Sequence, residues 1–305
     1  MTAGSSPSLA AAMQEIGAAT EAALEHLLPS PDGATARLDE AMRYACLGGG
    51  KRLRAILVVA SADLFGVPRA QSLRAAAAIE MLHAYSLAHD DLPCMDDDDL
   101  RRGRPSLHRA FDEATAVLAG DALQSQAFAV LADPATHADA AVRAELVAGL
   151  AQASGARGMV GGQVIDIDAE RRCLAGRPLD MAEITHLQAL KTGALIRFSA
   201  ESGAILGRAG AAERAALRDF ATDLGLAFQI ADDILDHEGS AEEVGKAVGK
   251  DAAAGKATFV GLLGLDGARA RARALTKSAQ EALAGFGEEA GILQALAEFV
   301  ITRRS

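Results

Sequence analysis

Apolar residues recur at helical spacing along almost the whole chain. Spacings of three and four residues place side chains on one face of an α-helix, whereas a half-buried strand alternates apolar and polar residues. Such strict alternation is hard to find in this sequence. The pattern therefore predicts an all-α protein, and it is clearest in two runs: Ile56, Val59, Ala60 and Leu64, and Leu217, Phe220, Leu224, Phe228 and Ala231.

Short stretches rich in turn-forming residues separate the helical runs, at 66–70, 103–106, 133–137 and 175–180. Glycine and proline favour turns, so short loops are expected there. After the last loop, Asp180 and Glu183 have the spacing of a capping box that begins a long helix. The stretch 237–257 is the least helical, and we interpret it as a mobile loop or short broken helices.

No repeat of fixed period and no linker rich in proline or serine divides the chain. We therefore expect a single domain over residues 1–305, with residues 1–8 as a disordered tail. The first residues lack the pattern of a signal peptide, and no apolar run is long enough to span a membrane. A cytoplasmic location is the resulting expectation.

The composition agrees with a helical globular protein and excludes several classes. Hydrophobic residues make up 50% of the chain and aromatic residues only 4%, and abundant alanine favours helix over sheet. The net charge is −11, from 41 acidic and 30 basic side chains. This balance argues against a protein that binds nucleic acid or an anionic membrane surface. Three scattered cysteines argue against a disulfide framework.

The densest polar feature is the stretch HDDLPCMDDDDLRRGRP at 89–105. Acidic runs are more often solvated surface, but this one follows an apolar helical stretch. His83 and Asp90 share one face of that helix. Pro93 should end the helix, which leaves Asp90 and Asp91 at its carbonyl end, where cations are attracted. Oxygen-only ligands favour Mg²⁺ over Zn²⁺.

A second acidic group, FQIADDILD at 228–236, lies on another helical pattern. Gln229, Asp232, Asp233 and Asp236 share one broad face, because their spacings are three, four and seven residues. One such string is weak support for a site, but two in one helical chain are hard to attribute to chance. Facing each other across a helical bundle, the two groups could hold several metal ions.

Isolated basic residues accompany the acidic groups, which suggests an anionic ligand bridged by metal. Neither Lys51 nor Lys256 fits the phosphate-loop pattern, so a nucleotide triphosphatase is disfavoured. The HExxH zinc motif and the nucleophile elbow of acyl-transfer enzymes are also missing. The basic candidates lie in GGGKRLR at 48–54, at Arg101 and Arg102, at Lys191 beside Thr192, and at Lys246, Lys250 and Lys256.

Together these motifs resemble those of the trans-polyprenyl diphosphate synthase family. In chain order they are GGKRLR, HDDLPCMDDDDLRRG, GMVGGQ, LKTGALI, FQIADDILD and a loop with glycine and lysine. The resemblance implies an all-α helical bundle of the isoprenoid synthase type around a deep central cavity, usually as a homodimer. It also implies a prenyltransferase that joins isopentenyl diphosphate to an allylic diphosphate.

The resemblance assigns roles to individual residues. The implied metal ligands, for about three Mg²⁺ ions, are Asp90, Asp91, Asp96, Asp232 and Asp236. The implied isopentenyl diphosphate site consists of Lys51, Arg54, His83 and Arg102. The implied contacts to the allylic diphosphate are Arg101, Lys191, Lys246 and Lys256. Thr192 and Gln229 would bind substrate and stabilise positive charge, and the implied catalytic set is Asp90, Asp96, Asp232, Lys191, Thr192 and Gln229.

The chemistry implied by the family has three steps. The allylic C–O bond ionises, the double bond of isopentenyl diphosphate attacks the carbocation, and a proton is lost to the released diphosphate. No protein nucleophile is required.

Product length is the finer question. Four residues separate the aspartate pair of the first motif from its third aspartate, and Tyr85 lies five positions before Asp90. Within the family this combination resembles the bacterial farnesyl diphosphate synthases, in which a bulky side chain floors the cavity after fifteen carbons. The small Ser86 would leave room beyond ten carbons. The expected product is farnesyl diphosphate, made from dimethylallyl and geranyl diphosphate, and the alternative is a geranylgeranyl or longer-chain synthase.

Two further interpretations are weaker. A terpene cyclase shares the first aspartate motif but typically has a different second motif and needs no isopentenyl site, so DDILD and GGGKRLR argue against it. A catalytically silent partner subunit usually lacks aspartates from one motif, whereas both are intact here. The loop reads GKATFV where relatives often have Ser or Thr after the lysine, which affects the lid, and Lys250 is left outside the site.

Overall fold

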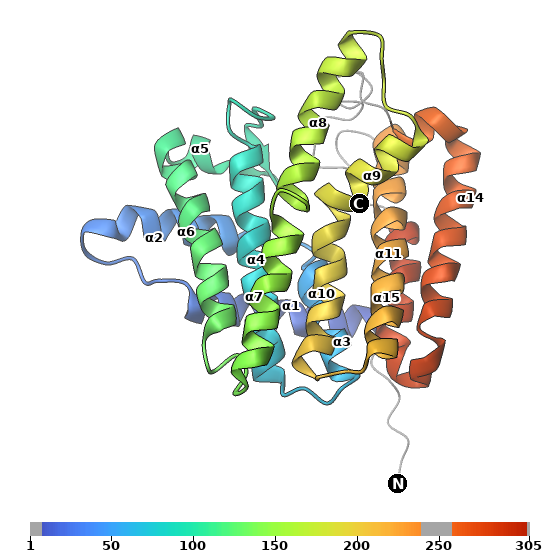
Figure 1. The fold of residues 1–305 in the computed structure, drawn as a ribbon. Coiled ribbons are helices and arrows are strands. Elements are labelled where there is room, and N and C mark those ends of the chain that lie inside the picture. Colours follow the sequence, from blue (N-terminus) through green and yellow to red (C-terminus); the bar gives the residue numbers. More distant parts are fainter. Residues whose placement is uncertain (1–7, 239–257, 304–305) are drawn as a thin grey trace. The chain divides into compact units, whose positions relative to one another are not determined.

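The computed structural model describes residues 8–238 and 258–303, and these are almost entirely helical (Figure 1). The prediction of an all-α protein is confirmed. Within the described ranges, strands are limited to a hairpin of two-residue strands, β1 (Leu100–Arg101) and β2 (Arg104–Pro105). No helix of these ranges combines the length and apolar character needed to cross a lipid bilayer.

The chain forms two compact units. Unit 1 contains the described residues up to Ala148 together with Ile205–Arg208, and unit 2 contains Gly149–Ala204 and the described residues from Ala209 onward. The single domain expected from the sequence therefore stays a prediction, as does the central cavity. The loop expected at 237–257 begins later than predicted, because residues 237 and 238 still belong to the helix 211–238. Its remainder, with Lys246 and Lys256, lies outside the described residues, as do residues 1–7 of the expected tail.

Unit 1 is built around α4 (Arg69–Asp90), in which every residue from 75 to 82 is buried. A helix that is buried on all sides needs small or apolar side chains on every face, and the run of four alanines at 75–78 meets this need. The other elements of this unit are α1 (Leu9–Leu27), η1 (Gly33–Thr35), α2 (Ala36–Cys46), α3 (Leu53–Asp63), the hairpin, α5 (Leu107–Ala110) and α6 (Glu113–Ala132).

Unit 2 contains a long antiparallel pair, α11 (Ala211–Glu238) and α14 (Phe259–Ala282), which run side by side (Figure 1). Their apolar faces share a core cluster that includes Ile230 and Phe259. The other helices of this unit are α8 (Met159–Leu174), α9 (Met181–Lys191), η2 (Ala284–Ala290) and α15 (Gly291–Thr302). Two helices change unit along their length, α7 (Ala140–Ser154) and α10 (Gly193–Leu206).

Side-chain caps mark where helices begin. The predicted capping box is present: Asp180 accepts hydrogen bonds from the N–H groups of Ala182 and Glu183, and the Glu183 carboxylate accepts one from the Asp180 N–H. The helix that it opens is shorter than expected, because α9 ends at Lys191 and α10 begins only after Thr192. Such caps satisfy N–H groups that the first turn of a helix leaves without partners.

Candidate active site

The first aspartate motif forms a tight turn at the end of α4. As predicted, the helix ends before Pro93: its last residue is Asp90, and the N–H of Asp91 still bonds to the Leu87 carbonyl at 3.0 Å. The chain then folds back, so that the N–H of Asp96 donates to the carbonyl of Asp90 at 2.9 Å. The turn therefore brings the first and third aspartates of the motif together.

Asp91 has a different environment from Asp90 and Asp96, which are half-buried. It is only 2% exposed, and its carboxylate is paired with the guanidinium of Arg101 through Nε and Nη2. Burial alone would lower the pKa of Arg101, but the nearby aspartates, Asp91 above all, outweigh burial and raise the pKa of Arg101. In this structure Asp91 positions Arg101, and its role as a metal ligand, which the resemblance implies, stays a prediction.

The hairpin after the motif presents Arg102. Arg102 and Gly103 both have positive φ, 54° and 73°, as the two central residues of a type I′ turn require. The Nη1 group of Arg102 donates to the carbonyl of Gly49, in the glycine-rich loop that precedes α3. A Cβ atom on Gly50 would lie 2.5 Å from the same Nη1. The loop thus holds the guanidinium of Arg102 where any larger residue would block it.

A basic cluster surrounds His83 on α4. Burial lowers the pKa of His83 well below its usual value, and the nearby cations of Arg54 and Arg102 lower it further. The imidazole is therefore neutral near pH 7. Burial likewise lowers the pKa of Arg102. Lys51, at the start of this group, is exposed, so the cluster has the positive charge and access that a diphosphate needs.

Tyr85 is packed between α4 and α6, with 6% of its surface exposed. Its ring packs perpendicular to the imidazole of His89, with centroids 5.3 Å apart, and Nε2 of His89 lies 3.0 Å from the Val117 carbonyl oxygen. Gly120 leaves the space that this imidazole occupies. Ser86, the next residue on α4, donates its hydroxyl proton to the His83 carbonyl at 2.9 Å. Tyr85 is therefore a fixed aromatic residue near the aspartate turn.

Lys191 and Thr192 lie in unit 2, at the break between α9 and α10. The Nζ group of Lys191 is 2.5 Å from Oδ2 of Asp166 on α8. One turn earlier on α8, Gly162 approaches Lys191 so closely that a Cβ there would lie 2.5 Å from the Lys191 Cα. Thr192 caps the end of α9 and leaves the helix with φ −112°. The position of Lys191 is thus determined by both a close backbone approach and an ion pair.

The second aspartate motif lies on α11 in the same unit as Lys191. A Cβ atom on Gly225, one turn before Gln229, would be 3.3 Å from the Cα of Gly193, so α11 passes close to the start of α10. Asp233 accepts a hydrogen bond from the Phe259 N–H at 2.7 Å. Asp233 is therefore occupied by the first turn of α14.

The neighbouring Asp232 pairs with Arg303, which follows α15. The Arg303 guanidinium also lies over the ring of Phe228, 4.1 Å from its centroid. In this structure Arg303 supplies the positive charge beside Asp232, and the role of Asp232 as a metal ligand stays a prediction. Asp236 completes the motif one turn further along α11, and it is half-buried.

The donor set fits magnesium. Within residues 8–238 and 258–303, no three or more His, Cys, Asp or Glu side chains are grouped as a ready metal centre. Mg²⁺ is usually held by one or two protein carboxylates, however, and completes its shell with water and substrate phosphate oxygens. The turn that joins Asp90 to Asp96, and the face that carries Asp232 and Asp236, offer carboxylates of this kind.

The sequence-predicted residues fall into two groups. Unit 1 holds the aspartate turn, the basic cluster and Tyr85, whereas unit 2 holds Lys191, Thr192, Gln229 and the α11 aspartates. Sequence reasoning missed the side chains that hold these residues in place. One had a visible signal, since Glu80 on α4 is an isolated acid in a largely apolar helical stretch, whereas Asp166 is one of three acids between 166 and 170. Arg303 had none.

Comparison with known proteins agrees with these motifs. Residues 35–296 match the family described as polyprenyl synthetase. The chain belongs to this family, and the resemblance seen in the sequence is confirmed. The protein is accordingly an enzyme of the trans-prenyltransferase class, which acts in isoprenoid biosynthesis.

Individual relatives differ in the products that their names give. The chain is 46% identical to a farnesyl diphosphate synthase of Escherichia coli over 269 residues, covering 87% of this chain and 88% of the relative. It is also 46% identical to a heterodimeric geranylgeranyl pyrophosphate synthase large subunit of Arabidopsis thaliana, covering 88% and 73%. A crystal structure of an FPP/GFPP synthase from Zymomonas mobilis aligns with a TM-score of 0.87 at 49% identity, covering 96% of this chain and 99% of that one.

Proposed function

We propose that the protein condenses isopentenyl diphosphate with dimethylallyl diphosphate and then with geranyl diphosphate, releasing farnesyl diphosphate and diphosphate. The observation that carries this proposal lies within unit 1. There a carboxylate turn suited to magnesium, at Asp90 and Asp96, follows the same helix that contributes His83 to a basic cluster. A metal-binding and an anion-binding group so close together suit two diphosphate substrates.

In this proposal the basic cluster binds isopentenyl diphosphate. Lys51, Arg54 and Arg102 provide positive charge for its phosphate oxygens, and neutral His83 can donate or accept a hydrogen bond without adding charge. The guanidinium of Arg102 is already held by the loop at Gly49. This preorganisation lowers the entropic cost of binding the substrate.

The remaining site residues are proposed to act on the allylic substrate. Asp90 and Asp96, and separately Asp232 and Asp236, are proposed magnesium ligands, and bound magnesium would neutralise the departing diphosphate. Arg101 and Lys191 would contact the phosphate oxygens. Asp91 holds Arg101 in place, and Asp166 holds Lys191 in place. Thr192 and Gln229 present oxygen atoms that can stabilise an allylic cation. Lys246 and Lys256 stay in the proposal on the resemblance alone.

Steady-state kinetics with purified protein test this function. We expect diphosphate release that requires both isopentenyl diphosphate and an allylic diphosphate and that stops when EDTA removes Mg²⁺. Asp90→Asn and Asp232→Asn should each lower kcat by about a hundredfold or more, because a metal-held leaving group loses several kcal/mol of stabilisation. Glu145→Gln, at an exposed position of α7, serves as control and should keep the wild-type rate. Full activity in EDTA would contradict the proposal.

Tyr85 is the proposed determinant of product length. We expect Tyr85→Ala to lengthen the product beyond fifteen carbons, because it removes a buried aromatic side chain, and Tyr85→Phe to keep it. Mass spectrometry of the dephosphorylated products measures both. An unchanged C15 product from Tyr85→Ala would show that the floor lies elsewhere.

The second candidate is a geranylgeranyl or longer-chain synthase. It is favoured by relatives of similar identity, including a geranylfarnesyl diphosphate synthase of Leucosceptrum canum at 44%. The farnesyl assignment is preferred because Tyr85, five positions before Asp90, is the bulky residue that the resemblance to bacterial farnesyl diphosphate synthases implies for the cavity floor. The homodimer and the cytoplasmic location stay predictions, and light scattering on purified protein measures the first of them.

A further inference from the structure

Arg52 lies between two residues of the proposed isopentenyl diphosphate site, yet it is placed differently from both. Lys51 is exposed and Arg54 is half-buried, whereas Arg52 is only 7% exposed. In the sequence, GGGKRLR reads as one uniform basic segment. The structure turns the middle basic side chain into the interior of unit 1.

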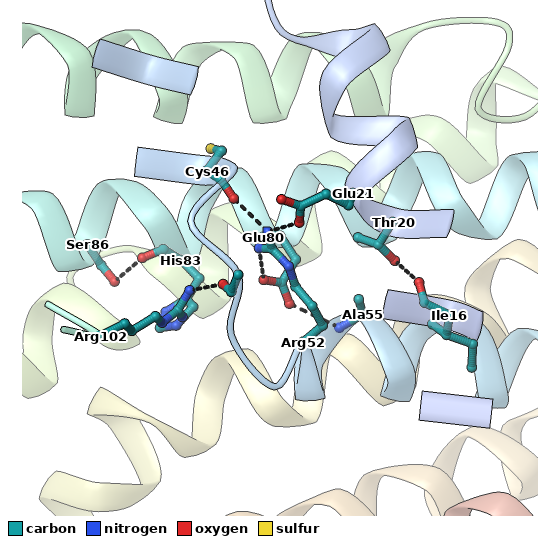
Figure 2. A network of polar contacts seen from close by, with 11 residues as sticks. Ile16, Thr20, Glu21, Cys46, Arg52, Ala55, Glu80, His83, Ser86 and Arg102 are labelled. Carbon is teal, nitrogen blue, oxygen red and sulfur yellow. Dashed lines mark hydrogen bonds and ion pairs between the residues drawn. The ribbon is translucent and has the colours of Figure 1, made fainter. Parts of the chain in front are cut away.

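The guanidinium of Arg52 connects four elements (Figure 2). Nη1 donates to Oε2 of Glu80 on α4 at 3.0 Å. Nη2 donates to the carbonyl oxygen of Cys46, which is the last residue of α2, at 2.6 Å. Nη2 also pairs with Glu21 on α1. Arg52 itself immediately precedes α3. One side chain therefore ties the start of α3 to three other helices.

Glu80 uses its second oxygen as well. Oε1 accepts a hydrogen bond from the Ala55 N–H at 3.2 Å, in the first turn of α3 (Figure 2). That turn has N–H groups without partners inside the helix. Glu80, which is 3% exposed, thus joins Arg52 to the helix that carries Arg54.

The loop held in this way has an unusual backbone. Gly49, Gly50 and Arg52 have φ values of 75°, 119° and 48°. A left-handed conformation costs a non-glycine residue free energy, and it persists only where surrounding contacts enforce it. The contacts of Arg52 with Glu80, Glu21 and Cys46 provide that enforcement. The same loop supplies the Gly49 carbonyl that holds Arg102.

The charge of Arg52 is satisfied internally. Burial alone would lower its pKa, but the carboxylates of Glu80 and Glu21 outweigh burial and raise it. The side chain stays charged and has two anionic partners before any substrate arrives. It is therefore suited to shaping the loop and poorly suited to binding a diphosphate.

We propose that Arg52 and Glu80 are positioning residues, which hold the loop at 48–54 so that Lys51, Arg54 and Arg102 can bind isopentenyl diphosphate. This inference rests on the proposed function. It separates the basic segment into residues that contact substrate and one residue that organises them.

Kinetics with one substrate varied at a time test the proposal. Arg52→Met and Glu80→Gln should raise KM for isopentenyl diphosphate by about tenfold, because displacing a binding group by a fraction of an ångström weakens binding strongly. The kcat and the KM for geranyl diphosphate should stay within about twofold, since only binding of one substrate is removed. Arg52→Lys should fall between, because lysine keeps the charge but lacks the fork that reaches several partners.

A control variant at Arg74, on the same helix α4 as Glu80, distinguishes positioning from general loss of stability. Arg74 donates to the Thr136 hydroxyl at 2.9 Å and lies 3.0 Å from an Asp133 oxygen, with 18% of its side chain exposed. Arg74→Met should lower the melting temperature without a selective effect on KM for isopentenyl diphosphate. If it raises that KM as much as Arg52→Met does, the positioning role is refuted.

Arg52→Met leaves a buried carboxylate without its partner and can fail to fold. The double variant Arg52→Gln/Glu80→Gln removes both charges and keeps the measurement possible, and it should show the same selective rise in KM. An unchanged KM for isopentenyl diphosphate in a folded variant overturns the positioning role of Arg52 and Glu80. The proposed function still stands in that case if the wild-type enzyme is active. An inactive wild-type protein would overturn both.

Discussion

Replacing Gly162 by alanine tests how the structure places Lys191. A Cβ atom at this position would lie 2.5 Å from Cα and 2.8 Å from Cβ of Lys191. The atoms of Lys191 at this contact belong to its backbone and Cβ, so they cannot move away as the end of a flexible side chain can. The helices α8 and α9 must therefore separate by about 1 Å to bring the new Cβ to a normal van der Waals distance from Lys191. The substitution therefore perturbs a proposed substrate-binding residue from outside it.

The free energy of this change has two parts. Overpacking of a well-packed interior typically costs about 1–3 kcal/mol, and alanine regains up to about 1 kcal/mol over glycine through helix propensity. With a gain of about 1 kcal/mol set against that cost, we expect Gly162→Ala to lower the free energy of unfolding by up to about 2 kcal/mol. Gly17 in α1 is the matched control, because no atom beyond its chain neighbours and the nearby backbone of its own helix lies within 4 Å of its added Cβ. Gly17→Ala should raise stability by about 0.5–1 kcal/mol.

Urea unfolding followed by far-ultraviolet circular dichroism measures both changes, and kinetics measure the effect on the site. Displacing Lys191 from its partner Asp166 should lower kcat/KM for geranyl diphosphate by about tenfold or more, whereas Gly17→Ala should leave it unchanged. If Gly162→Ala is as stable as Gly17→Ala or keeps full activity, the close approach of Gly162 does not place Lys191.

Three further predictions concern titration, thiol reactivity and metal binding. Burial depresses the pKa of His83 in the folded protein. As the pH falls through about 6.5, the imidazole of His83 therefore binds a proton in the unfolded chain before it does so in the folded chain. Stability should therefore drop between pH 7 and pH 5 more steeply than in His83→Gln, and parallel urea midpoints would contradict this. Burial raises the pKa of Cys46 to about 12, so a thiol reagent at pH 8 should label exposed Cys94 and reach Cys46 only in denaturant; labelling of native Cys46 would refute its burial. Arg303 and Mg²⁺ are proposed to compete for the Asp232 carboxylate. Arg303→Gln should therefore lower the Mg²⁺ concentration for half-maximal rate by about two- to fivefold, as expected for removing a part-exposed ion pair. An unchanged or higher Mg²⁺ concentration for half-maximal rate would refute this competition.

Features that depend on local pattern could be predicted from the sequence. Helical periodicity identified the α-helices, and Pro93 correctly placed the end of α4. The capping box at Asp180 and Glu183 depends on two residues three positions apart, and it was also predictable. The long helix expected after it was not, because the change of backbone at Thr192 has no signal in the apolar pattern. The two-residue strands of the hairpin are likewise too short to show alternation.

The candidate site was predictable in its residue types but not in its supporting contacts. The aspartate and basic motifs are visible because their charges interrupt apolar helices. Their partners lie far away in sequence: Arg303 pairs with Asp232 across 71 positions and Arg52 with Glu80 across 28. Nor does side-chain chemistry alone show that Arg52 is buried while Lys51 is exposed. That difference follows from a left-handed backbone at Arg52, which only tertiary contacts stabilise.

The length of the product made by the wild-type protein distinguishes a farnesyl diphosphate synthase from a longer-chain enzyme. Purified protein is incubated with Mg²⁺, isopentenyl diphosphate and dimethylallyl diphosphate, and the dephosphorylated products are identified by mass spectrometry. We expect farnesol as the main product and geraniol as a transient one. A predominantly C20 or longer alcohol, or no condensation product, would overturn the proposed function.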